Sequence, residues 1–136
     1  MPKLPLVCLD ASSFIDLFLD RPRAGKLAEV LQEINGRLAV STLTVSICSY
    51  LMQKADAQGS LLLLRDFAQD FQVLGVTDTT LTKAFRMVQD SDLEDALQVA
   101  CAQENGVGIF ITADKKLAER YDSFIKIRLI ASWLYL

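Results

Sequence analysis

Acidic side chains follow short apolar segments at widely separated points of the chain. Asp10 comes directly after an apolar run that begins at Leu4, and Asp114 follows a β-branched run that ends at Thr112. Asp95 lies near the start of a helical pattern. Carboxylates that are brought together repel one another unless protons or cations lie between them. Hard oxygen ligands without His or Cys suit Mg²⁺ or Mn²⁺, and such an ion can activate water and neutralise a phosphodiester.

Each of these aspartates also fits an ordinary helix cap. An Asp or Ser after a strand accepts hydrogen bonds from the free backbone N–H groups that begin a helix. Ser12 and Thr112 are similarly ambiguous, since a hydroxyl there can bind a ligand's water or only the local backbone. Asp92 lies one turn before Asp95 and is either a partner of the helix dipole or a further metal ligand. Residue types and spacing leave these alternatives open.

Composition excludes several classes of enzyme. Histidine is absent from the 136 residues, which rules out Ser-His-Asp and Cys-His catalysis and the HExxH zinc site. A net charge of −3 is unlike that of proteins that hold nucleic acid through a basic surface. Cys8, Cys48 and Cys101 lie in separate apolar segments, so we expect buried, reduced thiols in a cytoplasmic protein. No apolar run approaches the ~18 residues of a membrane span, so no membrane partner is expected.

The elements that must position the aspartates alternate between short strands and helices. We expect strands over residues 4–9, 38–41, 71–76, 107–112 and 124–130, and helices over 13–20, 26–34, 44–57, 61–69, 78–89, 92–105 and 115–121. Asn35 and Gly36 stop the second helix, and Thr77 with Asp78 caps the fifth. Ser91 and Glu94 match a capping box for the sixth helix, with Ser91 as N-cap. Asp16 and Asp20 are expected on the surface of the first helix.

This pattern predicts an α/β fold for a single domain that covers residues 1–136. Its fold class is a three-layer α/β/α arrangement with a short, mostly parallel five-stranded sheet, because buried apolar strands joined by helices form parallel sheets covered on both faces. Ligands of such sheets bind beyond the carboxyl ends of the strands, where the chain order switches. Asp10 and Asp114 follow two of these ends.

Three segments together resemble the PIN domain family, a small metal-dependent nuclease fold. The stretch LDASSFIDLF is similar to the family's opening motif, which places Asp10 first and Ser12 two positions later. The stretch DLEDALQVACAQENG resembles its third motif, with Asp95 as the ligand, and IFITADKKLAERY resembles its strand-end motif, with Thr112 and Asp114. The segments occur in the family's order over nearly the whole chain.

One segment departs from the family pattern. The second motif is a strand, a Ser-x-x-Thr-like cap and a helix that carries a Glu, and the matching stretch here is VSTLTVSICSYLMQK. The position of the Glu is held by Ile47, and no acidic residue occurs between Gly36 and Ala55. By resemblance, one of four ligands is missing, and Asp92 is a candidate to compensate for it.

The resemblance implies a Mg²⁺- or Mn²⁺-dependent endoribonuclease, of the kind found as toxins of toxin–antitoxin pairs. Asp10, Asp95 and Asp114 would hold the metal, RNA would be the substrate and an antitoxin protein the partner. The alternative is a degenerate PIN-like module that binds protein or RNA without cutting. A receiver or an aspartyl-phosphate phosphatase is a weaker alternative. The apolar segments 61–64 and 130–136 fit either core packing or a subunit contact, and the resemblance favours a homodimer.

Overall fold

Short parallel strands alternate with helices along the chain. The computed structural model describes residues 4–54, 60–88 and 92–130. The elements in order are β1 (Leu6–Leu9), α1 (Ala11–Phe18), α2 (Ala24–Ile34), β2 (Arg37–Ser41), α3 (Thr42–Lys54), α4 (Ser60–Ala68), β3 (Gln72–Leu74), α5 (Asp78–Met87), α6 (Leu93–Glu104), β4 (Ile109–Thr112), α7 (Lys115–Tyr121) and β5 (Ile127–Leu129). Each predicted element is present, and most strands are shorter than expected. None of the described helices is long and apolar enough to cross a membrane.

The sheet has five strands in the order β3-β2-β1-β4-β5, and all four neighbouring pairs are parallel. The central strand β1 pairs with β2 on one side and β4 on the other, with Cys8 opposite both Ala39 and Phe110. The chain order therefore switches between β1 and β4. This order differs from the 2-1-3-4-5 order of receiver-type folds, which excludes the receiver alternative.

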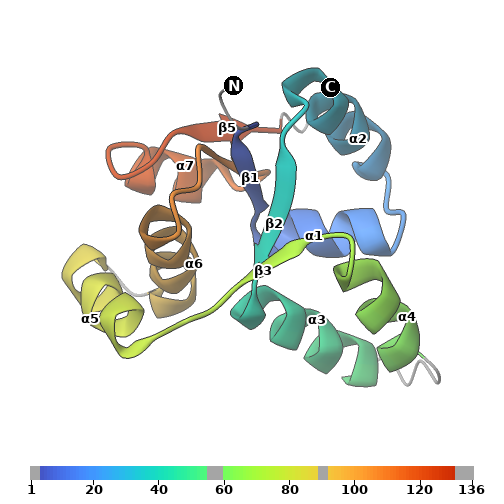
Figure 1. Cartoon of the computed structure of the whole chain (residues 1–136), viewed down its shortest axis with the longest axis horizontal. Helices are drawn as coiled ribbons and strands as arrows, with labels where there is room; N and C mark the ends of the chain where they lie inside the picture. Colours follow the sequence, from blue (N-terminus) through green and yellow to red (C-terminus); the bar gives the residue numbers. More distant parts are fainter. Residues whose placement is uncertain (1–3, 55–59, 89–91, 131–136) are drawn as a thin grey trace.

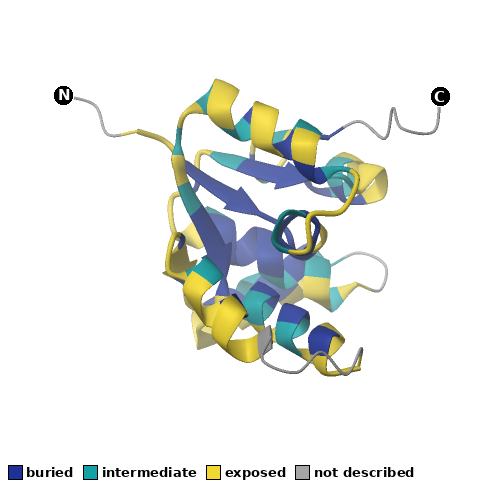
Figure 2. Ribbon diagram, turned by 90° about the vertical axis from the view of Figure 1, so that its right-hand side faces the viewer, coloured by how far each residue is buried: buried dark blue, intermediate teal, exposed yellow. Residues whose placement is uncertain are grey.

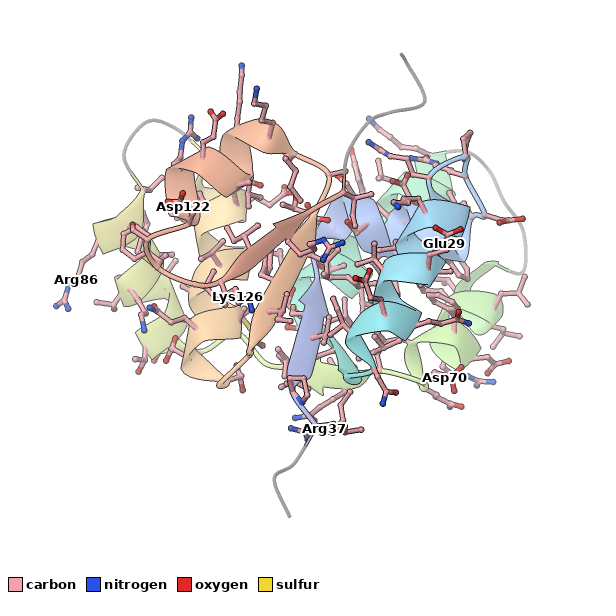
Figure 3. The ribbon with its side chains drawn as sticks, turned by 90° about the horizontal axis from the view of Figure 1, so that it is seen from above. Glu29, Arg37, Asp70, Arg86, Asp122 and Lys126 are labelled. Atoms are coloured by element: carbon pink, nitrogen blue, oxygen red, sulfur yellow. The ribbon has the colours of Figure 1, made fainter. Side chains whose placement is uncertain are left out.

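Two apolar layers cover the sheet, which confirms the predicted α/β/α architecture. Successive side chains of a strand point to opposite faces, so Cys8 and Phe110 pack with α5, α6 and α7, whereas Val7 and Ile111 pack with α1, α2, α3 and α4. Figure 1 shows the sheet between these two groups of helices. The central strands β1 and β4 are largely buried, whereas the edge strands β3 and β5 and the outer helix faces are largely exposed (Figure 2). Arg86, for example, projects outward from α5 in Figure 3.

The turn between α2 and β2 depends on its two residue types. Asn35 ends α2 in the left-handed region with φ of 52°, which Asn tolerates better than most residues. A Cβ on Gly36 would lie 2.3 Å from Cγ2 of Val7 and 2.7 Å from the carbonyl oxygen of Pro5. Only glycine lets the chain pass this close to β1, so the predicted helix stop also sets the approach of β2.

The N-cap predicted from the sequence is correct for α5 and wrong for α6. Thr77 is the N-cap of α5, as predicted. The predicted capping box of α6 is wrong, because the N-cap is Asp92, whose side chain accepts a hydrogen bond from the backbone N–H of Asp95. Glu94 is therefore the second helical residue, and Ser91 lies outside the described residues. The shorter helix places Asp95 in its first turn.

Asp16 is buried, contrary to the expectation that it lies on the surface. Its carboxylate forms an ion pair with Arg23 at 2.8 Å and a longer one with Arg21 at 3.7 Å. A buried carboxylate needs such partners, because its burial costs free energy otherwise. The Arg21–Arg23 turn therefore closes on α1. Asp20, which is exposed as expected, follows the C-cap residue Leu19 with φ of 52°.

Candidate active site

Asp10 joins the end of β1 to the start of α1. It is the N-cap of α1, and its Oδ1 accepts a hydrogen bond of 2.8 Å from the backbone N–H of Ser13. Its own N–H donates to the carbonyl oxygen of Ile111 on β4 at 3.0 Å. The residue is only 3% exposed, and this burial is the main reason that its pKa is raised above the usual range. The interpretation of Asp10 as a helix cap is therefore confirmed, but Asp10 is more buried than a cap requires.

Thr112 connects the first and the last acidic motif. It is the final residue of β4 and is fully buried. Its hydroxyl donates to Oδ2 of Asp10 at 2.5 Å and accepts a hydrogen bond of 3.0 Å from the backbone N–H of Asp114. The hydroxyl therefore fixes the Asp10 carboxylate and also the turn that presents Asp114, as the neighbouring carboxyl ends of β1 and β4 allow.

Asp114 is the N-cap of α7, as the sequence predicted. Its Oδ1 accepts hydrogen bonds from the backbone N–H groups of Lys116 at 3.0 Å and Leu117 at 3.2 Å. No donor among the described residues contacts its Oδ2. The residue is exposed, so one carboxylate oxygen is available to a ligand while the other holds the helix start.

Asp95 lies in the first turn of α6 and completes the acidic group. Burial is the largest cause that raises its pKa to about 7, and the charges of Asp92 and Asp114 add to this effect. The charge of Asp114 also contributes to the raised pKa of Asp10. The charge of Asp114 therefore acts on both Asp10 and Asp95.

The donor chemistry of this neighbourhood fits a hard divalent cation. A cation between like charges stabilises them, and oxygen ligands without His or Cys suit Mg²⁺ or Mn²⁺. None of the ion pairs among the described residues neutralises Asp10, Asp95 or Asp114. As placed, however, the described side chains contain no ready-made group of three or more potential ligands.

The other predicted residues, Asp92, Ser12 and Ile47, have different roles in the structure. Asp92 is exposed and caps α6, so its carboxylate already has a backbone partner. Ser12 is exposed on the first turn of α1, and its side chain makes no hydrogen bond with a described residue. Ile47 is half-buried and packs against the apolar layer formed by α1, α2, α3 and α4. The departure at Ile47 is therefore an apolar contact in this fold.

Residue-type reasoning missed Gln98. This side chain is buried on α6, and its Oε1 accepts a hydrogen bond of 2.8 Å from the backbone N–H of Ala11. Thr44 on α3 also approaches this oxygen, with its hydroxyl at 3.4 Å. The available signal was a polar residue within an apolar helix segment, three positions after Asp95 and hence on the same helix face.

A comparison with family models identifies the chain. The model described as "PIN domain" matches residues 7–122, which is most of the chain and includes the three aspartates. The chain belongs to the PIN domain family. This PIN domain assignment confirms the family that the three sequence segments resemble. A search of curated proteins found no match.

Solved structures share the fold of this PIN domain at low sequence identity. VapC20 of Mycobacterium tuberculosis, a Sarcin-Ricin loop cleaving toxin, has a TM-score of 0.71 and 14% identity, covering 90% of this chain and 98% of that chain. A toxin–antitoxin complex from Klebsiella pneumoniae has a TM-score of 0.70 and 18% identity, with coverage of 92% and 98%. DNA-bound VapBC from Salmonella typhimurium has a TM-score of 0.69 and 17% identity, with coverage of 96% and 100%. At these identities the likeness supports the fold.

Proposed function

We propose that this PIN domain is a Mg²⁺- or Mn²⁺-dependent endoribonuclease. The observation that carries the proposal is the hydroxyl of Thr112, which links the buried Asp10 carboxylate to the turn of Asp114. Asp95, with its pKa raised to about 7, adds a third carboxylate whose charge is unfavourable without a cation. Such convergence at a switch point of a parallel sheet is typical of a ligand site.

Each residue of the site would have its own role in the proposed cleavage. Asp10, Asp95 and Asp114 would hold the metal, with water completing the shell and with Asp92 as a further candidate ligand. When bound, the ion supplies an activated water and neutralises charge on the phosphodiester. Thr112 keeps the Asp10 carboxylate in one orientation, which lowers the cost of ordering it on binding. Ser12, exposed on the first turn of α1, would contact the substrate or a bound water.

We also propose a partner protein. Several structural neighbours are toxin–antitoxin complexes, so we infer that an antitoxin covers Asp10, Asp95 and Asp114 and inhibits cleavage, with a basic side chain opposite these carboxylates. RNA as the substrate, a homodimer and a cytoplasmic location belong to the same proposal.

A second candidate function is a binding module without nuclease activity. Two observations favour it: Ile47 makes an apolar contact where the family carries an acidic residue, and the described carboxylates form no ready-made group of three ligands. Such a module would bind RNA or a protein through the same surface. The two candidates differ in one measurable property, which is metal-dependent cleavage.

The deciding experiment is cleavage of single-stranded RNA by the purified protein with Mn²⁺. We expect cleavage that stops on addition of EDTA and falls by at least roughly 100-fold in Asp10→Asn. Asn preserves the Oδ1 acceptor for Ser13 and the side-chain shape, so the variant should fold, which circular dichroism checks. Full activity in Asp10→Asn would contradict the assignment.

Asp16→Asn provides the matched control for this substitution. Asp16 lies on the same helix and is as buried as Asp10, but its partners are Arg21 and Arg23. We expect it to lose stability without losing the activity of the folded fraction. No cleavage by well-folded wild-type protein on several RNAs would favour the binding module instead.

A further inference from the structure

A buried glutamine connects α6 with the residue that follows Asp10. Gln98 is 3% exposed, and its neighbours Ala96 and Val99 are fully buried apolar residues. Its Oε1 accepts the hydrogen bond of 2.8 Å from the backbone N–H of Ala11, 87 positions away in the sequence. A polar side chain in such surroundings costs free energy unless it is hydrogen-bonded. The Ala11 contact therefore explains why an amide is accommodated there.

The N–H of Ala11 is one that a helix cannot satisfy by itself. The first N–H groups of an α-helix have no partner within the helix. In α1, Asp10 accepts from the third of them, Ser13, through its side chain. The first, that of Ala11, is buried and depends on Gln98 from another layer of the fold. The same helix start thus carries Asp10 and is attached to α6.

Gln98 is also attached to the segment that carries Asp95. The two residues are three positions apart on α6, so they share one face of the helix. The hydroxyl of Thr44 on α3 approaches the same amide oxygen at 3.4 Å. This hydroxyl also accepts a hydrogen bond from the Ser41 hydroxyl at the end of β2, and the backbone N–H of Thr44 donates to the Ser41 hydroxyl. The Oε1 atom of Gln98 on α6 therefore contacts both α1 and α3.

We propose that Gln98 is a positioning residue, which sets the separation of Asp10 and Asp95 by holding the start of α1 against α6. The inference rests on the proposed function, since it gives these two carboxylates a common ligand. Gln98 acts through Ala11 and contacts neither RNA nor metal. Loss of its oxygen leaves the N–H of Ala11 unpaired and lets the two segments move apart, so the carboxylates bind a cation less tightly.

Gln103 provides a matched control on the same helix. Its Nε2 donates to the carbonyl oxygen of Phe124 at 2.8 Å. Gln98→Met and Gln103→Met therefore each remove one hydrogen bond between a side chain and the backbone, with similar changes in shape, and Gln98→Met also removes the 3.4 Å hydrogen bond from the Thr44 hydroxyl. Gln103 lies eight positions after Asp95, which is roughly 12 Å along the helix. A general loss of stability affects both variants, whereas a change at the acidic site affects only Gln98→Met.

The experiment measures Mn²⁺ affinity without RNA, by electron paramagnetic resonance, together with the thermal midpoint and hydrogen exchange of the Ala11 amide in metal-free protein. We expect Gln98→Met to bind Mn²⁺ about tenfold more weakly or worse and to exchange the Ala11 amide faster than wild type. Gln103→Met should match wild type in Mn²⁺ affinity and in exchange of the Ala11 amide, even if its thermal midpoint falls as much as that of Gln98→Met.

The outcomes separate this inference from the function on which it rests. If wild type binds Mn²⁺ and both variants bind it equally well, Gln98 is an ordinary structural residue and the inference is overturned. Unchanged exchange of the Ala11 amide in Gln98→Met would also overturn it, because the hydrogen bond would then not hold the start of α1. If wild type itself binds no Mn²⁺, the proposed metal site fails before any variant is compared.

Discussion

At the scale of single residues, the three carboxylates differ in what fixes them. Asp10 is buried and accepts hydrogen bonds on both oxygens, from Ser13 and Thr112. Asp114 is exposed and uses one oxygen for the start of α7. Asp95 is half-buried, and no described residue donates a hydrogen bond to its carboxylate. Asp95 is therefore the member whose charge most needs an external partner.

This difference predicts how metal-free stability depends on pH. The folded-state pKa of Asp95 is about 7, above its ordinary 3.8, first because of burial and then because of the Asp92 and Asp114 charges. Between these values the folded protein binds more protons than the unfolded chain, so the free energy of unfolding falls as pH rises. The raised pKa of Asp10 acts in the same direction. Urea unfolding in EDTA at about pH 5 and about pH 7.5 measures the fall.

Asp95→Asn should flatten this pH dependence, because Asn does not titrate. Addition of Mg²⁺ or Mn²⁺ at neutral pH should raise the stability of wild type and have less effect on Asp95→Asn, since a ligand that binds only the folded state stabilises it. Equal slopes with pH in wild type and variant would show that Asp95 titrates normally.

At the scale of elements, α3 decides whether the site is complete. Ile47 lies one turn after Thr44, whose hydroxyl approaches Gln98 at 3.4 Å, so the two share a helix face. Ile47 also packs against the apolar layer on the α1 side of the sheet. The position at which the family resemblance predicts a Glu is thus held by an apolar side chain, on the helix face that approaches Gln98.

Ile47→Glu is expected to lower the free energy of unfolding by about 1–3 kcal/mol, because it places a carboxylate at a half-buried apolar position. It should also strengthen Mn²⁺ binding, because it adds the acidic group that α3 lacks. Isothermal titration with Mn²⁺ and urea unfolding measure the two effects. Ser46→Glu, on the exposed side of the same helix, controls for added charge alone. Weaker or unchanged Mn²⁺ binding by folded Ile47→Glu would show that this helix face does not contribute to the site.

At the scale of the whole molecule, apolar side chains remain outside the two packed layers. Leu61, Leu62 and Leu63 of α4 are more than half exposed, whereas Leu64 is buried. The predicted apolar segment 61–64 therefore splits between the core and the surface. The other predicted segment, 130–136, contributes Ile130 to the core, and its remaining residues lie outside the described part of the chain. Exposed leucines in sequence favour a protein contact.

We expect a second copy of the chain to cover Leu61, Leu62 and Leu63, because the proposed function includes a homodimer. We expect the isolated protein to sediment as a dimer at micromolar concentration and Leu62→Lys to sediment as a monomer. Phe85→Lys on α5 is the control, because Phe85 is equally exposed, 59% against 60% for Leu62, and lies on the opposite side of the sheet. If the wild-type protein sediments as a monomer at every concentration tested, the dimer is contradicted. The exposed leucines would then be assigned to the contact with the proposed antitoxin.

Much of the fold follows from local patterns in the sequence. The order and kind of elements could be predicted because alternation of apolar segments, the Asn35–Gly36 stop and the Thr77 cap act within a few residues. Asp10 and Asp114 could be placed at strand ends for the same reason. The cap of α6 was misjudged, because the two candidates Ser91 and Asp92 are adjacent and local chemistry permits either.

The sequence by itself determined which residue types follow the ends of β1 and β4. Together with the family motifs, it indicated the three aspartates. Only the tertiary structure decided the strand order and the contacts between distant residues. Thr112 reaches Asp10 across 102 positions and Gln98 reaches Ala11 across 87. No local propensity encodes such pairs, because they form only when the two segments are packed on the same sheet.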